Sequence, residues 1–185
     1  MGGSGLTVHN FSTSLGFSNG YTDAPWWEQV YRKAFPSFAG MVSVRSEGWA
    51  QRGGIDRVIT LASGRTYSVD EKVRAEDWPD FLLEYWSDFG RRVPGWVAKD
   101  LACDFIAYAF APSKKCYLLP FAQLRRAWRD NSRDWVQAGH GNSRGFHHVE
   151  AFNEERERAW TTVSIAVPIE IAMKAITDAM LVTWD

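Results

Sequence analysis

The sequence predicts an α/β or α+β fold, with one mixed central β-sheet flanked by helices. Three observations predict it. The chain has 185 residues, 45% of them hydrophobic, which is enough for a full core in one domain. Helix-like and strand-like segments alternate along it, and we find no internal repeat. We therefore expect an irregular arm over residues 1–23 and a single domain over residues 24–185.

Each expected element has its own local signal. Thr22 or Asp23 can cap a first helix that begins at Pro25 and ends at Phe35, before a proline. Alternating or apolar runs predict the strands, and apolar spacing of three to four residues predicts the helices. The further expected elements are strands at 41–47, within 53–74 on both sides of a turn at 62–65, and at 81–88; a helical turn at 94–100; a hairpin at 104–121; a helix at 121–128; a strand at 161–167; and a helix at 168–180.

Residues 129–158 are polar and rich in arginine, so we expect a surface excursion there. The first five residues, Met1 to Gly5, are assigned no function.

Charge and cysteine content exclude several classes of protein. The formal net charge is −1, which argues against a protein that coats DNA without regard to sequence. Cys103 and Cys116 lack the spacing of a zinc site, and we expect buried free thiols in a reducing, cytoplasmic compartment. No apolar run is long enough to span a membrane, and no phosphate-binding loop of the ATPase type is present.

The segment 53–74 carries the chemistry. An antiparallel hairpin that turns at Ser63 and Gly64 places Asp56 opposite Asp70. Because side chains alternate along a strand, Asp70 and Lys72 project from one face, about 6 to 7 Å apart, and Glu71 projects from the other. Two carboxylates on one face can hold Mg²⁺, and a neighbouring lysine can orient or activate a water. A solvated pair on a surface hairpin gives the same pattern.

This segment, GIDRVITLASGRTYSVDEKVR, resembles the signature of the PD-(D/E)XK nuclease superfamily, in phage-encoded or resolvase-like forms. Asp56 matches the acid that opens one strand, with Ile55 in place of the proline, and Asp70-Glu71-Lys72 matches the acid-x-lysine tripeptide. The resemblance spans about residues 25–130. It implies a restriction-endonuclease-like fold, metal ligation by Asp56 and Asp70, and a metal contact from the backbone carbonyl of Glu71. The side chain of Glu71 is the alternative ligand if the strand bulges.

The resemblance also implies an acid on the preceding helix, which here is Glu28. A salt bridge between Glu28 and Arg32 is the competing interpretation. Glu84 lies in an apolar run, so its carboxylate must either find a partner or reach a polar edge. It is a candidate for supporting the site residues.

Basic residues near the expected site are candidates for nucleic-acid contacts. Arg74 shares the face of Lys72, and the helix at 121–128 carries Arg125 and Arg126. Lys114 and Lys115 at a hairpin tip are further candidates for the same role. His140, His147 and His148 lack acidic partners at metal-site spacing, which favours a loop that moves over substrate.

The sequence therefore predicts a Mg²⁺- or Mn²⁺-dependent nuclease acting on DNA, alone, as a homodimer or within a larger phage or host complex. One alternative is a catalytically silent nucleic-acid-binding or protein-interaction module on the same fold, because fold does not fix function. A small-molecule enzyme that uses the acid pair is a third hypothesis, with no positive signal for it.

Overall fold

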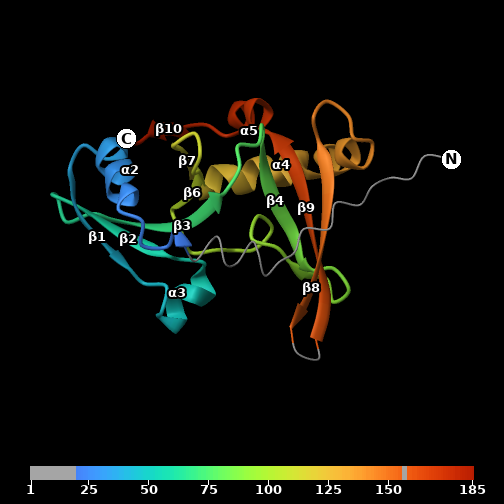
Figure 1. Ribbon diagram of the computed structural model, residues 1–185, viewed down its shortest axis with the longest axis horizontal. Coiled ribbons are helices and arrows are strands. Elements are labelled where there is room, and N and C mark those ends of the chain that lie inside the picture. The colour runs from blue at the N-terminus through green and yellow to red at the C-terminus, as the bar shows by residue number, and fades with distance from the viewer. Residues whose placement is uncertain (1–19, 156–157) are drawn as a thin grey trace.

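The computed structural model describes residues 20–155 and 158–185. The described strands form two sheets, shown in Figure 1. The six-stranded sheet has the order β1-β2-β3-β6-β7-β10 and the four-stranded sheet the order β5-β4-β9-β8. The strands of the six-stranded sheet are β1 (Phe38–Ser43), β2 (Arg57–Leu61), β3 (Thr66–Arg74), β6 (Phe105–Phe110), β7 (Lys115–Pro120) and β10 (Met180–Thr183). Those of the four-stranded sheet are β4 (Asp80–Asp88), β5 (Val93–Pro94), β8 (His147–Glu155) and β9 (Arg158–Pro168).

Four helices are described: α2 (Trp26–Ala34), α3 (Gly48–Gly53), α4 (Phe121–His140) and α5 (Ile169–Ala175). None of them is both long and apolar enough to cross a membrane. The fold is thus mixed α+β, as the sequence predicts, but β4 and β9 belong to a second sheet and not to one central sheet.

The six-stranded sheet is mixed because β3 and β6 run parallel, whereas its other pairs are antiparallel. A parallel pair needs a long connection. Here that connection contains β4 and β5, which belong to the other sheet, where β4 pairs with β5 on one side and with β9 on the other. The chain therefore carries β4 to the opposite side of the core before it returns to β6.

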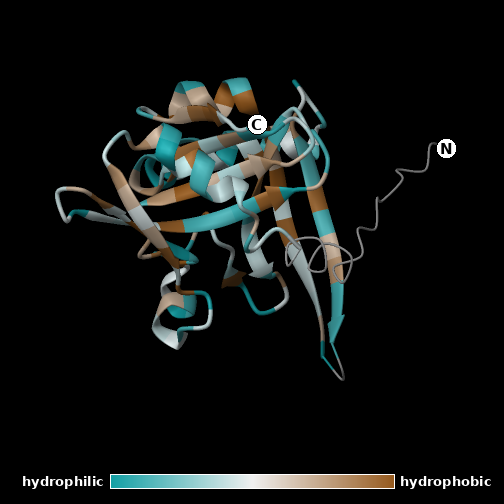
Figure 2. Cartoon of the chain, turned by 60° about the vertical axis from the view of Figure 1, so that its left-hand side comes forward, coloured by the Kyte–Doolittle hydropathy of each residue, from teal (hydrophilic) through white to brown (hydrophobic). Residues whose placement is uncertain are grey.

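Two cores cover the two faces of the six-stranded sheet. On one face, α2 buries Trp27, Val30 and Tyr31 against residues such as Val69 and Ala107. The other face is packed against the four-stranded sheet and α4, with members of all three in one cluster; they include Ile106, Phe81, Leu83, Ile165 and Leu124. In Figure 2 hydrophobic residues concentrate along the strands between the layers, and hydrophilic ones at the hairpin end of the four-stranded sheet.

The predicted excursion at 129–158 is wrong in its secondary structure. α4 continues to His140, and residues 147–155 form β8, paired with β9. Along α4, Leu124, Ala127 and Trp135 are buried at helical spacing, while Arg129 and Arg133 are exposed. The arginines therefore occupy the outer face of an amphipathic helix. Because they make the composition of the segment polar, composition alone does not reveal the buried apolar residues.

Three other expectations need correction. The last helix ends at Ala175 instead of residue 180, and β10 follows it, pairing antiparallel with β7. The first strand covers Phe38–Ser43, so the segment after it is free to form α3, which was not expected. Residues 96–98 form a turn, and the predicted helical turn at 94–100 is absent from this described segment. The arm predicted at 1–23 lies, for residues 1–19, outside the described residues.

Candidate active site

The hairpin of β2 and β3 has the predicted register. Arg57 pairs with Val69 and Val58 with Ser68, so the next position toward the open end joins Asp56 and Asp70. Asp56 directly precedes β2, and its backbone is held on both sides. Its N–H donates to the carbonyl of Val69 at 2.8 Å, and its carbonyl accepts from the N–H of Val44 at 2.9 Å. The Asp56 side chain is therefore fixed at the mouth of the hairpin.

The helix α3 sets the direction in which the chain enters this position. α3 ends at Gly53 and is capped by Gly54, whose φ of +64° lies in the left-handed region that glycine tolerates best. A Cβ there would lie 2.8 Å from a side-chain carbon of Leu101. Glycine thus lets the chain turn tightly against Leu101 just before the candidate acid.

Asp56, Asp70 and Lys72 meet in one place. Asp56 accepts a hydrogen bond from the backbone N–H of Glu71 at 2.7 Å, and Lys72 Nζ lies 2.6 Å from Asp70 Oδ1. Burial, together with the adjacent Asp56 carboxylate, raises the pKa of Asp70 to about 6, against the opposing effect of Lys72. The two carboxylates therefore repel each other in a poorly solvated setting, and an added cation would relieve that cost.

Lys72 is a cation in this arrangement. Burial acts to lower its pKa, but the carboxylates of Asp70, Asp56 and Glu84 outweigh that effect, and the pKa is raised above its usual value. A protonated ammonium has three donors and no acceptor. Lys72 can therefore orient a water or stabilise negative charge, but in this state it cannot remove a proton.

Glu71 lies on the opposite face of β3, as the alternation predicts. Its carboxylate is buried and accepts from Tyr31 Oη at 2.6 Å and from Arg57 Nε at 2.6 Å. Burial and Glu71 together raise the pKa of the Tyr31 hydroxyl well above its usual range. The side chain of Glu71 is thus engaged in the core beneath α2, and it points away from the face that Asp70 shares with Lys72.

Arg45 contacts one carboxylate on each face of the β2–β3 hairpin. Its guanidinium lies 3.0 Å from Asp56 Oδ1 and 2.8 Å from Glu71 Oε2, while its Nε is buried without a partner among the described residues. Sequence reasoning gave no role to Arg45 or Arg57. Strand parity could have found Arg57, because it places Arg57 on the same face as Val69 and Glu71. No local signal points to Arg45, which reaches the hairpin from the segment between β1 and α3.

The structure does not bring Glu28 to the acid pair. Glu28 is exposed on α2 and forms an i,i+4 salt bridge with Arg32 at 2.7 Å, which was the competing interpretation. α2 covers the face of the sheet that carries Val69, whereas Asp70 projects from the other face. Glu84, in contrast, interacts electrostatically with Lys72 from β4: burial raises the pKa of its carboxyl, and the Lys72 ammonium opposes that shift.

The predicted basic contacts lie in separate places. Arg74 stays on the face of Lys72, 5.8 Å from the ring of Trp78 and 3.5 Å from the hydroxyl of Tyr108. Arg125 pairs with Asp100, and Arg126 with Asp130, both on or beside α4. Lys114 and Lys115 are exposed in the β6–β7 hairpin.

The three histidines do not lie on one mobile loop. His140 ends α4, and its ring stacks on that of His148 in β8, with ring centroids 4.1 Å apart; His147 is the first residue of the same strand. His148 also shares a hydrogen bond of 3.0 Å with the Tyr85 hydroxyl. Burial and the neighbouring His140 lower the pKa of His148. These contacts place the histidines at the junction of α4 with the four-stranded sheet.

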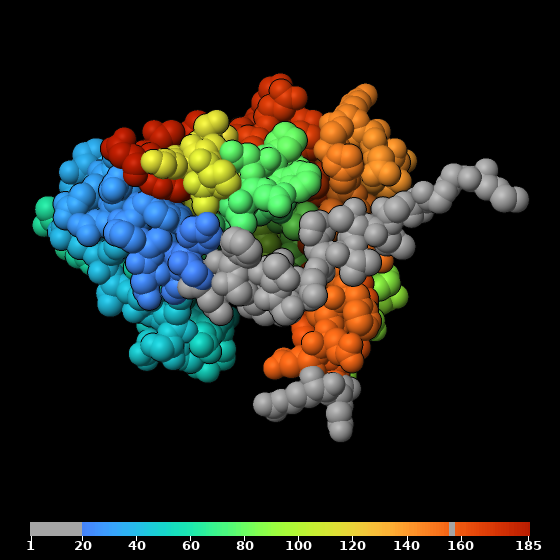
Figure 3. Space-filling view, in the orientation of Figure 1, coloured from blue at the N-terminus to red at the C-terminus, as the bar shows by residue number. Residues whose placement is uncertain are grey.

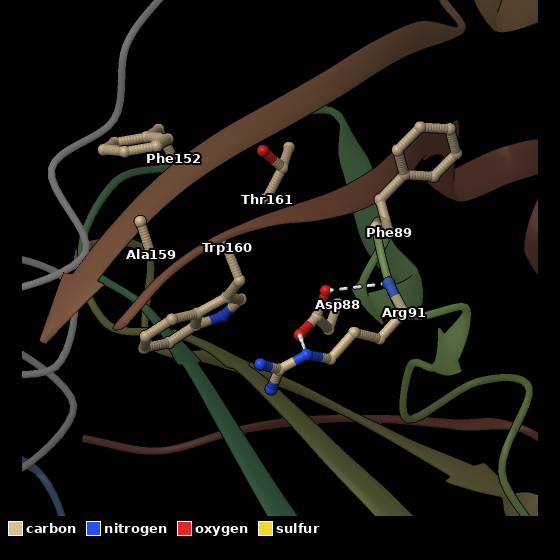
Figure 4. A pocket seen from close by; sticks show the side chains of 8 residues that line it. Asp88, Phe89, Arg91, Phe152, Ala159, Trp160 and Thr161 are labelled. Atoms are coloured by element: carbon tan, nitrogen blue, oxygen red, sulfur yellow. Dashed lines mark hydrogen bonds and ion pairs between the residues drawn. The ribbon is translucent and has the colours of Figure 1, made fainter. Parts of the chain in front are cut away.

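A hollow of about 380 Å³ lies elsewhere, at the far end of the four-stranded sheet. Figure 4 shows its wall, where the Asp88 carboxylate faces Arg91 beside Trp160, Thr161 and Phe152. Its lining includes none of the three predicted site residues, Asp56, Asp70 and Lys72.

Figure 3 shows β8 and α3 as two separate lobes that project from the same side of the molecule.

Metal ligation rests on few groups. Among residues 20–155 and 158–185, no three or more His, Cys, Asp or Glu side chains are disposed to hold one metal ion. Asp56 and Asp70 thus form a pair of carboxylates without a third protein side chain. Mg²⁺ characteristically binds through one or two carboxylates and keeps several waters, whereas structural zinc needs a closed set of four ligands. The pair fits Mg²⁺ or Mn²⁺ and does not fit structural zinc.

Comparisons of this chain with protein-family models, with curated proteins and with solved structures give no match.

Proposed function

We propose that this protein is a Mg²⁺-dependent nuclease that hydrolyses phosphodiester bonds in DNA. The observation that carries the proposal is the convergence of Asp56, Asp70 and Lys72 at the mouth of one hairpin. The two acids are the metal ligands in this proposal, together with the backbone carbonyl of Glu71. The raised pKa of Asp70 supports this role, because two close, poorly solvated carboxylates favour a bound cation.

The chain's own residues divide the work of the reaction. When bound, the metal would polarise the phosphate and lower the pKa of a coordinated water. Asp56 and Asp70 would hold that ion through their carboxylates. Lys72 donates a hydrogen bond from its ammonium and so orients the water or offsets the charge that develops on the phosphate oxygens. Arg45 keeps Asp56 in place through the contact at 3.0 Å.

The order of the elements also supports the proposal. A helix, α2, precedes the strands, and the hairpin of β2 and β3 carries the two acidic positions in the expected register. The restriction-endonuclease-like fold is part of the proposal. The proposed DNA contact nearest the acids is Arg74, which projects from the same face of β3. Arg125 and Arg126 on α4 are proposed to bind the phosphate backbone farther along.

One observation favours the silent module as a second candidate. In the metal-free chain each of the two acids already contacts a cation: Asp56 contacts Arg45, and Asp70 contacts Lys72. A structural ion-pair network also perturbs pKa values. A protein that kept this network for stability alone would bind no metal and cleave nothing.

A cleavage panel separates the two candidates. Wild-type protein, Asp70→Asn and Lys72→Ala are incubated with single-stranded, duplex and branched DNA in Mg²⁺, Mn²⁺ or chelator. We expect metal-dependent cleavage by wild type and a loss of at least about 100-fold in both variants, with unchanged circular dichroism. Lys174→Ala, an exposed change on α5, is the matched control and should cleave like wild type. Metal-dependent cleavage by Asp70→Asn at the wild-type rate would contradict the assignment.

A further inference from the structure

Lys72 lies between an acid and an aromatic ring. Its Nζ lies 2.6 Å from Asp70 Oδ1, and the ammonium sits 5.6 Å from the centroid of the Trp96 ring. The negative charges of Asp56 and Glu84 also act on the ammonium and raise its pKa. Asp70 belongs to the same strand as Lys72. Glu84 and Trp96 reach it from β4 and from the turn after β5 in the other sheet.

The backbone holds Glu84 and Trp96 together through Gly95. A Cβ on Gly95 would lie 2.3 Å from the carbonyl oxygen of Glu84 and 2.7 Å from its Cγ, so only glycine permits this approach. The N–H of Gly95 donates to the backbone carbonyl of Tyr85 at 2.9 Å, and the N–H of Val97 donates to the backbone carbonyl of Glu84 at 3.2 Å. The backbone N–H of Trp96 faces the Glu84 carboxylate. Glu84 and Trp96 thus form one rigid wall beside Lys72.

We propose that Glu84 and Trp96 are positioning residues for Lys72, holding its ammonium against Asp70 in the orientation that the reaction needs. This inference rests on the proposed nuclease function. A lysine has a flexible stem of four carbons, and one ion pair leaves several rotamers open. The negative charge of Glu84 and the electron-rich face of Trp96 both attract the ammonium. Together they restrict it to one pose. Asp70 accepts one of its three N–H groups, and the other two remain for water or phosphate.

A purely structural role for Glu84 is the rival explanation. Asp80 shows what such a role looks like: it is buried on the same strand, and burial raises the pKa of its carboxyl against the effect of Arg74. β4 therefore supplies two acids that interact with two cations of β3, and these charges could simply hold the sheets together. The test must separate the pose of Lys72 from the stability of the fold.

Steady-state kinetics on DNA at saturating Mg²⁺ provide the first readout. We expect Glu84→Gln and Trp96→Leu to lower kcat roughly 10- to 100-fold, since small displacements of a catalytic group have effects of this size. KM for DNA and the half-saturating Mg²⁺ concentration should stay within about twofold of wild type. Glu84→Asp and Trp96→Phe keep the charge and the ring, and should recover most of the loss. Glu150→Gln, an exposed acid on β8, is the control and should leave kcat unchanged.

An unchanged kcat in Glu84→Gln would overturn the inference. So would a loss of kcat that Glu84→Asp fails to restore and that follows the loss of thermal stability from variant to variant, because that pattern belongs to a structural role.

Crystal structures of metal-free wild type and Glu84→Gln provide the second readout, which needs no activity. We expect the Lys72 ammonium to bind Asp70 beneath Trp96 in wild type and to leave that position in the variant. An identical Lys72 pose in both structures would overturn the inference. If wild type cleaves no substrate, the proposed function fails, and the crystal structures still decide whether Glu84 positions Lys72.

Discussion

At the scale of single residues, the peptide unit between Asp70 and Glu71 separates two kinds of carboxylate. Asp70 faces the site and carries a raised pKa of about 6. Glu71 faces the core beneath α2, where Arg57, Arg45 and Tyr31 satisfy both of its oxygens. These two neighbouring residues therefore have opposite effects on the free energy of unfolding. Ionised Asp70 lowers it, and Glu71 raises it by anchoring β3 to the core.

Replacing Asp70 should make the metal-free protein more stable at alkaline pH. The pKa of Asp70 is about 6 in the folded chain against 3.8 for an unperturbed aspartate, so the folded state binds more protons between these values and stability falls as pH rises through them. Asp70→Asn removes that loss, and Asp56 and Glu84 remain as partners for Lys72. At pH 8 we expect its Tm to rise by about 2 to 8 °C, with the difference vanishing near pH 4. A lower Tm for Asp70→Asn at pH 8 would contradict this account.

Replacing Glu71 should have the opposite effect. Glu71→Gln leaves the buried Arg57 without its charged partner, and breaking a buried ion pair costs about 3 to 5 kcal/mol. Chemical denaturation measures the free energy of unfolding. Glu28→Gln is the matched control: it breaks an exposed glutamate–arginine pair, which is worth about 0.5 kcal/mol. Equal losses in the two variants would show that the Glu71 network contributes no more than a surface pair.

At the scale of elements, the contact between β4 and the turn after β5 is the tightest that the described glycines make with backbone atoms. Gly95 sits directly against the backbone of Glu84, closer than any other residue type permits. β5 itself contains only two residues, so its pairing with β4 depends on this approach. The position of the Trp96 ring depends on the same contact.

Gly95→Ala should therefore separate this turn from β4. The added methyl group would lie 2.3 Å from the Glu84 carbonyl oxygen, and backbone atoms must move to admit it. We expect a loss of about 1 to 3 kcal/mol in the free energy of unfolding and a lower rate of cleavage. Gly40→Ala in β1 is the control, because a Cβ there meets no atom within 4 Å. Stability equal to wild type in Gly95→Ala would rule out the close contact.

The elements also show what sequence can predict. The turn at Ser63–Gly64 fixes the register of Asp56 with Asp70, and alternation places Glu71 on the other face; both follow from local periodicity. The neighbours Arg45, Trp96 and Glu84 come from other segments, and no local pattern specifies such contacts. For the same reason the sequence could not reveal that β4 leaves the six-stranded sheet. The helix predicted at 121–128 forms the first part of α4; the rest of α4, and β8, were missed because their exposed polar residues dominate the composition of 129–158.

At the scale of the whole molecule, the two sheets share one core. Phe81 and Leu83 of β4 belong to the same buried cluster as Ile106 of β6 and Leu124 of α4. Neither sheet keeps this apolar face buried without the other. The two sheets should therefore unfold together.

A cavity in the four-stranded sheet should destabilise the whole described fold. Leu83 is fully buried, and Leu83→Ala is expected to cost about 2 to 5 kcal/mol. Thermal unfolding followed by far-ultraviolet and by near-ultraviolet circular dichroism should give one coincident transition at lower temperature. Two separate transitions, with only one of them shifted, would show that the sheets unfold independently.

The parallel pairing of β3 with β6 has a consequence for the order of folding. The acid pair lies on a hairpin whose strands are joined by four residues, Ala62 to Arg65, so contacts close in sequence are enough to assemble it. The wall of Glu84 and Trp96 forms only after the chain has left the six-stranded sheet, paired β4 with β9 in the other sheet, and returned as β6. Pairings between residues so distant in sequence form slowly. On a nascent chain, the hairpin with both acids is therefore complete before β9 exists to hold the wall in place. The protein can complete its site only after the residues of β9, Arg158–Pro168, have been made.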